Sequence, residues 1–178
     1  MLNESKYFLQ SSRLGFRTWN ENDLPLALIL WGDEKVTRYI DSRKSLNDDQ
    51  VRDRLWREIE TEKSHNIQYW PIFLLEKNEF VGCCGLRPYD DSRGIFEIGA
   101  HIVRKFWRRG IATGAAKTVI EYAFNVLKVN ALFAGHNPEN KASRNFLQKL
   151  GFKYTHDEYY KPTGLNHPSY LFSAEDYI

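Results

Sequence analysis

The chain has 178 residues, of which 42% are hydrophobic, 15% aromatic and 27% charged. This length suits one compact domain, and this composition excludes an intrinsically disordered chain, which would contain fewer apolar residues. Basic residues outnumber acidic ones by only 25 to 23, and no apolar run approaches the ~18 to 20 residues that a membrane span needs. We therefore expect a single domain over residues 1–178, with neither nucleic acid nor membrane as partner.

The start of the chain and its cysteines are typical of a protein kept in a reducing compartment. Residues 1–6 lack the charged and then apolar pattern of a secretory signal peptide. The two cysteines, Cys83 and Cys84, are adjacent, and neighbouring residues of a strand point to opposite faces. We expect them to be small core residues rather than a disulfide or a metal clamp. The sequence thus predicts a cytoplasmic protein without a bound metal.

The first third of the chain predicts one short strand and two helices. Residues 14–18 alternate like a strand, and Asn20 or Asn22 can cap the helix that follows. A second helix is expected to begin near Ser45 or Asn47. The inward residues of this second helix are Val51, Leu55 and Ile59, and the outward residues are Arg52, Asp53, Arg57 and Glu58.

Three strand-like runs follow, over residues 67–75, 80–86 and 95–103. Pro71 interrupts the first run, and proline cannot donate a hydrogen bond to a neighbouring strand. We therefore predict that this run is an edge strand or a bulged strand. The four residues between the first two runs suit a hairpin.

The second half of the chain alternates between helices and strands. Residues 112–127 have the strongest helical periodicity, and residues 131–135 are typical of a short buried strand. Asn140 can cap a further helix, which Gly151 closes. The last two predicted strands are residues 152–160 and residues 170–173. This order predicts an α/β (α+β) domain with a mixed sheet covered by helices.

Residues 104–113 are the most informative segment, because they join a strand to the strongest helix. Four basic residues fall within six positions, and Gly110 lies at the turn. The first amides of a helix lack internal partners and carry partial positive charge, and glycine lets a phosphate approach the backbone. Spacing alone leaves two interpretations open, a pyrophosphate site and a solvated basic turn. The glycines of a Walker loop or a dinucleotide-binding fingerprint are absent.

Trp107-Arg108-Arg109-Gly110-Ile111-Ala112 resembles the acyl-CoA pyrophosphate loop of the GNAT acetyltransferases, in the branch that acetylates the N-termini of ribosomal proteins. Further segments are similar to that family and occur in the same order. They are Arg13-Leu14-Gly15-Phe16-Arg17 with Asn22-Asp23, Phe80-Val81-Gly82, Phe96-Glu97-Ile98-Gly99, Asn137-Pro138-Glu139-Asn140-Lys141-Ala142-Ser143 and Leu150-Gly151-Phe152. The resemblance covers roughly residues 13–176.

The resemblance implies a single GNAT-like domain with a central mixed, largely antiparallel sheet. This sheet would have six to seven strands, splayed at strands 4 and 5, with about four helices. The reaction implied is direct transfer of an acetyl group from acetyl-CoA, a co-substrate, to an amine. The protein would have to place the amine within about 3–3.5 Å of the thioester carbonyl and remove a proton from the ammonium.

The resemblance also implies which residues bind acetyl-CoA. Pantetheine runs along the fourth strand in this family, which places the backbone of Ile102 and Val103 beside it. Asn140 caps its helix, contacts the cofactor, or does both. The turn and the helix start would contribute Arg108, Arg109, Gly110, Ile111, Ala112 and Thr113. Gly114 departs from the family, where glutamate is usual, and a glycine in the first helical turn costs up to ~1 kcal/mol relative to alanine.

Glu97 and His101 are the candidates for proton removal. In an unbulged strand they share one face, so a carboxylate and an imidazole suited to acid–base chemistry lie four residues apart. A bulge between them would place them on different faces. The alternative is structural: Glu97 pairs with an arginine and His101 is a half-buried strand residue.

The leaving thiolate needs a proton donor, and many GNAT relatives use a tyrosine in the last motif helix. The corresponding position here is Leu147, which cannot donate a proton. Ser143 matches the serine that the ribosomal branch uses instead, and we expect it to act directly or through a water. A serine in a first helical turn also commonly bonds to the backbone. His136 is within reach of the acetyl site by topology.

Three functions remain open at this point. The first is an acetyl-CoA-dependent N-acetyltransferase, monomeric or homodimeric, that acts on a protein N-terminal amine or a small-molecule amine. The second is an acyl-CoA sensor or partner-binding module without catalysis, which the missing tyrosine favours. The third, nucleic-acid binding through residues 104–109, is discouraged by the small net charge and by the lack of a reading helix.

Overall fold

One eight-stranded sheet, in the order β1-β2-β3-β4-β5-β6-β8-β7, forms the centre of the molecule. The computed structural model describes residues 6–177, so the first five residues of the predicted start segment lie outside the described residues. All neighbouring strands are antiparallel except β5 and β6, which run parallel. The predicted mixed, largely antiparallel sheet is therefore confirmed, with more strands than the six to seven expected.

The elements have the following bounds. The strands are β1 (Leu9–Gln10), β2 (Leu14–Phe16), β3 (Tyr69–Leu74), β4 (Glu79–Asp90), β5 (Ile95–Ile102), β6 (Ala131–Gly135), β7 (Lys153–Tyr160) and β8 (Leu165–Ser173). The α-helices are α1 (Leu24–Trp31), α2 (Glu34–Thr37), α3 (Asp48–His65), α4 (Ile111–Tyr122) and α5 (Lys141–Lys149). Short 3-10 segments cover Glu21–Asp23, Asp91–Arg93, Arg104–Phe106 and Ala174–Tyr177, and a π-helical turn, Ala123–Leu127, continues α4. The one-turn α2 and the two-residue β1 are elements that sequence periodicity did not predict.

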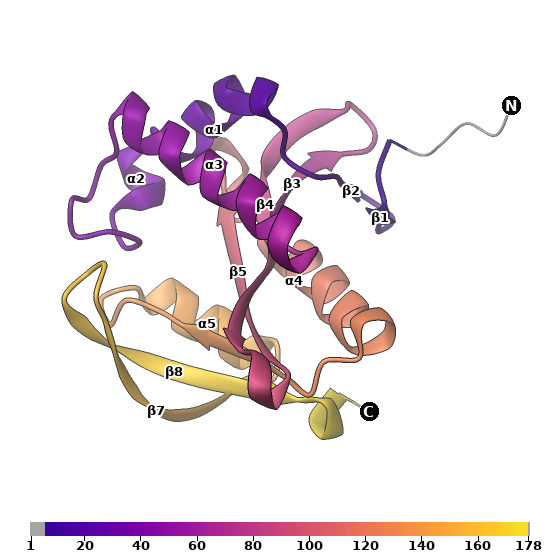
Figure 1. Ribbon diagram of the computed structural model, residues 1–178, viewed down its shortest axis with the longest axis vertical. Helices are drawn as coiled ribbons and strands as arrows, with labels where there is room; N and C mark the ends of the chain where they lie inside the picture. The colour runs from indigo at the N-terminus through magenta and orange to yellow at the C-terminus, as the bar shows by residue number, and fades with distance from the viewer. Residues whose placement is uncertain (1–5, 178) are drawn as a thin grey trace, which may run out of the picture.

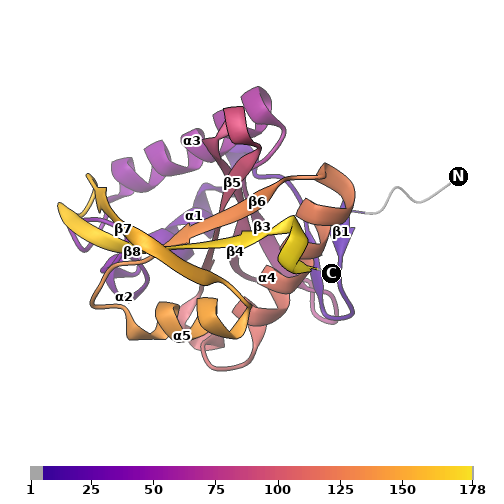
Figure 2. The same cartoon turned by 90° about the horizontal axis from the view of Figure 1, so that it is seen from below.

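The helices cover both faces of the sheet. In Figure 1, α3 crosses in front of the sheet, and the tip of the β7–β8 hairpin lies beside the loop between α2 and α3, where the Ser42 amide donates to the Pro162 carbonyl at 2.8 Å. Figure 2 shows α3 on one side of the strands and α4 and α5 on the other. Cys83 and Cys84 of β4 are fully buried and unbonded to each other, as expected for small core residues. No helix within residues 6–177 is long and apolar enough to cross a membrane.

α3 begins and ends on local signals that are visible in the sequence. The Asn47 side chain accepts a hydrogen bond from the Gln50 amide, while the Gln50 side chain accepts one from the Asn47 amide. This reciprocal capping satisfies two otherwise unpaired donors. The predicted start near Asn47 is therefore confirmed. One side-chain prediction was wrong: Glu58, expected to face outward, is only 1% exposed.

Residues 67–75 were expected to form an edge strand or a bulged strand; β3 is an interior strand with a bulge, so the bulged alternative is confirmed and the edge position was wrong. It pairs with β2 on one side and with β4 on the other, with a register shift between Ile72 and Phe73. The carbonyl of Pro71 accepts a hydrogen bond from the Arg17 amide, just beyond the end of β2. The N–H that proline lacks therefore falls where the β2–β3 ladder already stops, so no ladder bond is lost.

Candidate active site

A cleft opens where β5 and β6 separate. These parallel strands pair only between Ile95–Glu97 and Ala131–Phe133. Beyond that point β5 stays paired with β4 as far as Ile102, and β6 stays paired with β8 as far as Gly135. The opening encloses about 910 Å³ and is lined by β5, β6, β8 and the first turns of α4 and α5, among others. The splay implied by the family resemblance is therefore present.

The open edge of β5 has a defined set of backbone groups. The Val103 amide donates to the Val81 carbonyl of β4 at 2.9 Å. Because hydrogen-bonded pairs alternate along an antiparallel ladder, the backbone groups of Ile98, Ala100 and Ile102 point away from β4. The Ile102 carbonyl already accepts a hydrogen bond from the indole of Trp107 at 2.7 Å. Thus Ile98, Ala100 and the amide of the predicted Ile102 direct edge groups toward the cleft, whereas the predicted Val103 directs its amide to β4.

The turn before α4 presents a row of backbone donors. Arg108 and Gly110 both have left-handed backbone conformations, with φ of 61° and 73°. The first helical bond in this turn is donated by the Gly114 amide to the Gly110 carbonyl at 2.9 Å. Within the described part of the chain, no group accepts a hydrogen bond from the amides of residues 108–113. A β-carbon at Gly110 would face open space, so its φ and not crowding favours glycine there.

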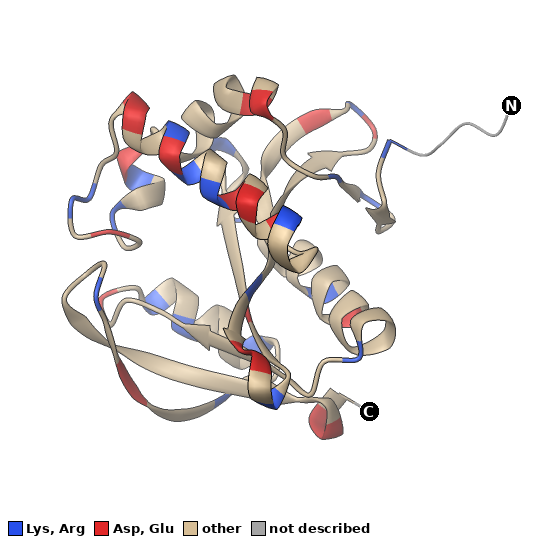
Figure 3. Cartoon of the chain, viewed as in Figure 1, with Lys and Arg blue, Asp and Glu red and all other residues tan. Residues whose placement is uncertain are grey.

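The charges of this turn are partly neutralised. Arg104 forms an ion pair with Asp33 at 3.2 Å, and Lys105 forms one with Glu79 at 2.6 Å. These pairs leave the two arginines that precede Gly110 as exposed cations beside the open amides. Figure 3 shows basic and acidic residues mixed along α3 and over the other elements in that view. Two cations without an ion pair to any residue of 6–177 therefore lie beside the open amides, where the helix dipole adds to their positive potential.

Glu97 lies at the point where β5 and β6 separate. The Tyr69 hydroxyl donates a hydrogen bond to the Glu97 carboxylate at 2.7 Å. Tyr69 pairs with Gly85 on β4, which in turn pairs with Gly99 on β5, so the phenol lies across two glycines. A β-carbon at Gly99 would lie 2.3 Å from the Tyr69 hydroxyl oxygen. Burial and the nearby Glu97 charge raise the pKa of Tyr69 well above its usual value, so Tyr69 remains a hydrogen-bond donor.

His101 lies on the same face of β5 as Glu97, and the β4–β5 register has no shift between them. Its Nδ1 accepts a hydrogen bond from the Trp31 indole at 3.2 Å, which places the ring proton on Nε2. Burial, with repulsion from Arg54 and Arg87, holds the pKa of His101 well below its usual value. The imidazole is therefore neutral, and the nitrogen able to take up a proton already accepts a hydrogen bond.

The start of α5 faces the cleft from the other side. Asn140 caps the helix: its side-chain oxygen accepts a hydrogen bond from the Ser143 amide at 3.2 Å. The Ser143 hydroxyl makes no hydrogen bond to another described residue and lines the cleft. Leu147, one turn further on, is buried and also lines the cleft. A hydroxyl is thus the only proton donor that these two α5 side chains offer.

His136, after β6, is held by its neighbours. Its Nδ1 donates to the Asn137 carbonyl at 2.8 Å, and its Nε2 lies 3.4 Å from the Tyr170 hydroxyl. Its ring also stacks on that of Tyr170. These contacts fix the ring in the wall of the cleft and occupy both of its nitrogens.

The cleft brings together most of the site residues predicted from the sequence. Arg109 and Val103 do not line it, since the Arg109 guanidinium lies over the Phe106 ring and the Val103 amide bonds to β4. The predicted residues that line it are Glu97, His101, Ile102, Arg108, Gly110, Ile111, Ala112, Thr113, Asn140 and Ser143. Sequence reasoning missed Tyr69, Arg54, Arg87 and Tyr160, which line it too. No local motif distinguishes these four residues, because their partners lie far away in the sequence.

Potential metal ligands are scattered over the molecule. Among residues 6–177, no group of three or more histidine, cysteine, aspartate or glutamate side chains is arranged to hold a metal ion.

Comparisons with known proteins agree with this geometry. The family model described as "Acetyltransferase (GNAT) domain" matches residues 13–153. The uncharacterized N-acetyltransferase p20 of Bacillus licheniformis is 29% identical over 145 residues, which cover 82% of each chain. The uncharacterized protein YkkB of Bacillus subtilis is 28% identical over 153 residues, covering 85% of this chain and 88% of its own.

Solved structures share the fold. A GNAT-family acetyltransferase from Bacillus anthracis superposes with a TM-score of 0.80 at 22% identity, covering 94% of this chain and 98% of its own. RimL, a ribosomal L7/L12 alpha-N-protein acetyltransferase in complex with coenzyme A, superposes with a TM-score of 0.76 at 16% identity, covering 93% and 97%. At these identities the structural likeness concerns the fold alone. Because the family model spans well over half of the sequence, the chain belongs to the GNAT acetyltransferase family.

Proposed function

We propose that this protein transfers an acetyl group from acetyl-CoA directly to a primary amine. The acceptor is the N-terminal amine of a protein or a small-molecule amine. The observation that carries this proposal is the position of Glu97. This carboxylate lines the same cleft as the open amides of residues 108–113, at the point where β5 and β6 part.

The turn before α4 is suited to the pyrophosphate of acetyl-CoA. Its amides lack protein acceptors, its helix begins with Ile111, and Arg108 is exposed beside it. Backbone donors at a helix start bind phosphate through hydrogen bonds and the helix dipole. The open edge groups of Ile98 and Ala100 would hold the pantetheine arm. When bound, acetyl-CoA supplies an activated acetyl thioester. Residues of the protein would orient the acceptor, remove its proton and stabilise the leaving thiolate.

Glu97 is proposed to take the proton from the attacking amine, directly or through one water. The Tyr69 hydroxyl fixes one carboxylate oxygen by its hydrogen bond, and the other is left to meet the acceptor. His101 is proposed as a positioning residue: its neutral ring packs against the rings of Tyr69 and Trp31, with centroids 5.6 and 6.5 Å away. It would thus hold Tyr69 in place without taking up the proton.

Ser143 is proposed to stabilise or protonate the leaving thiolate. Its amide is held by Asn140, which leaves its hydroxyl available to the cleft. The alternative function, an acyl-CoA-binding module without catalysis, is favoured by Leu147, since an apolar side chain cannot protonate a thiolate. The two functions differ in turnover and agree in cofactor binding.

The test has two stages. Thermal melts with acetyl-CoA, CoA and ATP should show stabilisation by the first two, since a ligand that binds the folded state stabilises it by RT ln(1 + [L]/Kd). Free-thiol release from acetyl-CoA is then followed with a panel of N-terminal peptides and small amines. Acetylation of any amine, identified by mass, supports the enzyme. Binding of CoA without turnover on the whole panel favours the binding module, and equal shifts for all three nucleotides would refute both.

A further inference from the structure

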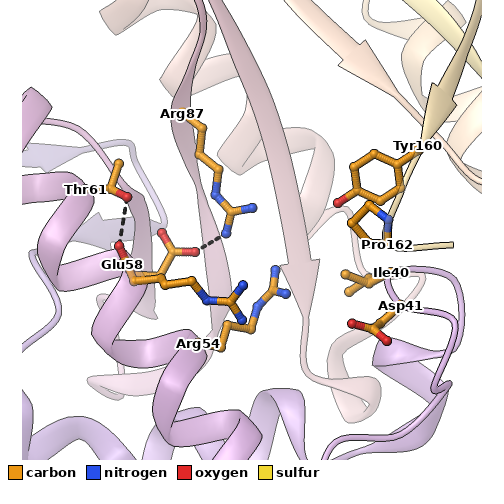
Figure 4. A pocket seen from close by; sticks show the side chains of 9 residues that line it. Ile40, Asp41, Arg54, Glu58, Thr61, Arg87, Tyr160 and Pro162 are labelled. Atoms are coloured by element: carbon orange, nitrogen blue, oxygen red, sulfur yellow. Dashed lines mark hydrogen bonds and ion pairs between the residues drawn. The ribbon is translucent and has the colours of Figure 1, made fainter.

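A second, smaller cavity adjoins the cleft on the side away from the turn before α4 (residues 104–113), which we call the phosphate turn. It encloses about 260 Å³ and shares Ile40, Arg54, Arg87 and Tyr160 with the cleft. Figure 4 shows Arg54 and Arg87 directed toward the cavity from one side, with Ile40 and Tyr160 on the other. Arg54 and Arg87 therefore border the same space as Glu97, and an acceptor in the cleft can contact all three.

Arg54 is a buried cation that forms no ion pair within residues 6–177. It belongs to α3 and is 9% exposed. Its guanidinium makes no hydrogen bond or ion pair with any residue in the described part of the chain, and its Nε is buried without an acceptor. Its cationic carbon lies 4.9 Å from the centre of the Trp31 ring, and this contact holds the side chain without satisfying its donors.

The carboxylates near Arg54 are already engaged by other groups. Glu58 forms an ion pair with Arg87 and accepts a hydrogen bond from the Tyr69 amide. Asp41, on the opposite wall, accepts hydrogen bonds from Arg43 at 2.6 and 2.8 Å. Each acidic group has its own donor, so the unused donors of Arg54 face the cavity.

The surroundings of Arg54 make an anionic ligand favourable. Burial lowers the pKa of Arg54, and repulsion from Arg87 lowers it further, while the nearby Glu58 charge opposes both. The first two effects penalise a buried charge that no anion contacts directly. Tyr160 lies close enough to both arginines and to Glu97 for all three charges to affect its pKa. Burial and the Glu97 charge raise the pKa of Tyr160, whereas Arg87 and Arg54 lower it. The arginines and Glu97 therefore act on one shared space.

We propose that the acceptor is a small amine that also carries a carboxylate, such as a free amino acid, and that Arg54 binds this carboxylate. This inference rests on the proposed function and names the substrate class of the same site. A planar carboxylate matches the forked donors of a guanidinium. With its carboxylate on Arg54, the acceptor directs its amine toward Glu97. The cavity of about 260 Å³ is in keeping with a small molecule rather than a folded partner.

The first experiment compares each of a panel of free amino acids with its own carboxamide, which has the same amine and side chain but no negative charge. Acetylation is followed by thiol release and by product mass. We expect at least one amino acid to be acetylated with a kcat/KM about 10- to 100-fold above that of its amide, the range for hydrogen bonds to charged groups. The amide has the less basic amine, so at neutral pH more of it is unprotonated and able to attack, and a preference for the amino acid would run against this advantage.

The second experiment removes the charge of Arg54. Arg54→Met keeps much of the side-chain volume against Trp31 and should reduce kcat/KM for the amino acid to about that of the amide, a loss of about 10- to 100-fold. Turnover of the amide should fall by a much smaller factor than turnover of the amino acid, and Arg54→Lys should restore part of the preference. Arg52→Met, on an exposed position of the same helix, is the matched control and should leave both rates unchanged.

The outcomes separate the inference from the proposed function. If amines are acetylated but no amino acid exceeds its amide, the carboxylate subsite is refuted and the enzyme stands. If no amine is acetylated although CoA binds, the proposed function is refuted, and the acceptor assignment is refuted with it. A peptide with an acidic side chain that outperforms all free amino acids would also overturn the small-molecule assignment. We expect Arg54→Met to melt no lower than the parent protein, because it removes an unpaired buried charge. A large fall in its melting temperature would make Arg54 structural.

Discussion

The phosphate turn, residues 104–113, and the arginine cavity around Arg54 lie at two ends of the same cleft, and they are built in different ways. The turn comes from one continuous segment, its two arginines at positions 108 and 109 are exposed, and its amides lack protein acceptors. The arginine cavity comes from α3, β4, the segment after α2 and the β7–β8 turn, and its central cation is buried. One end is local and solvated, whereas the other is assembled from distant parts of the chain.

Because the two ends are built differently, they are suited to different ligands. Exposed backbone donors cost little to maintain, because water satisfies them until a ligand arrives. A buried guanidinium without a counter-ion is costly, and the cost is offset only when an anion binds. The turn therefore suits a group common to every reaction cycle, the pyrophosphate. The arginine cavity suits discrimination among acceptors.

The largest expected effect lies between the two ends. Glu97→Gln keeps the size of the side chain and removes its basicity, so turnover should fall by ~10²- to 10⁴-fold, the usual range for general base catalysis. Affinity for acetyl-CoA, measured by ligand-dependent melting, should not change. Glu121→Gln, exposed on α4, is the control and should retain full rate. Full turnover by Glu97→Gln would move proton removal to another group or to solvent.

A pair of matched glycines tests the turn. Gly110 and Gly164 have φ of 73° and 70°, and a β-carbon added at either position would have no atom within 4 Å. Alanine at either position should cost about 1–2 kcal/mol of stability, because left-handed backbone is unfavourable for L-residues. Only Gly110→Ala should also weaken acetyl-CoA binding, by ~10-fold, since 1.4 kcal/mol corresponds to one decade. Equal affinities in the two variants would disconnect the turn from the cofactor.

The pH dependence of stability tests the buried end. His101 and His167 both have a pKa below the usual value, through burial first; the second cause is repulsion from Arg54 and Arg87 for His101 and the nearby His136 for His167. The folded state resists protonation while the unfolded state accepts it. The free energy of unfolding should therefore fall as the pH drops below ~6.5, by up to ~1.4 kcal/mol per pH unit for each histidine.

His101→Gln isolates one of these contributions. In denaturant titrations between about pH 5 and pH 7.5, the free energy of unfolding should change less steeply with pH for this variant than for the parent. The difference in slope should reach up to ~1.4 kcal/mol per pH unit, which corresponds to one proton. The comparison uses the slope with pH and not the stability itself, so a general loss of packing against Trp31 does not disturb it. An unchanged slope would mean that His101 titrates normally.

The smallest expected effect is on the wall opposite Glu97. Ser143→Ala should lower turnover by ~5-fold, the value of about 1 kcal/mol for one hydrogen bond, with unchanged acetyl-CoA affinity. Its backbone amide would still bond to Asn140, so the helix cap should survive and the melting temperature should stay the same. A Ser143→Ala variant that binds acetyl-CoA more weakly would assign the hydroxyl to cofactor binding.

The same contrast between local and distant contacts explains what could be predicted from sequence. The caps at Asn47 and Asn140 and the strand at residues 131–135 rest on signals within a few positions, and the structure confirms them. The outward placement of Glu58 was wrong, because its partner Arg87 lies on a strand 29 residues away. Helical periodicity could not anticipate a polar residue drawn inward by a distant cation.

The candidate site shows the same division. The turn residues were identified from one segment and a family resemblance, whereas Tyr69 and Arg54 carried no local signal. Tyr69 meets Glu97 across 28 positions, and His101 meets Trp31 across 70. Pro71 predicted an edge strand or a bulged strand, and the bulge is present between Ile72 and Phe73. The edge position was wrong because the sequence does not show that β2 ends beside Pro71. Chemistry that depends on contacts between distant elements needs coordinates.

The phenol of Tyr69 lying across Gly85 and Gly99 has a consequence for redesign of this enzyme. Any side chain at position 99 would collide with Tyr69, and moving Tyr69 would release the Glu97 carboxylate. Libraries intended to broaden acceptor choice should therefore leave this tyrosine and both glycines intact. Substitutions should instead be introduced at Ile40 and Pro162, which line the arginine cavity on the wall opposite Arg54 and Arg87.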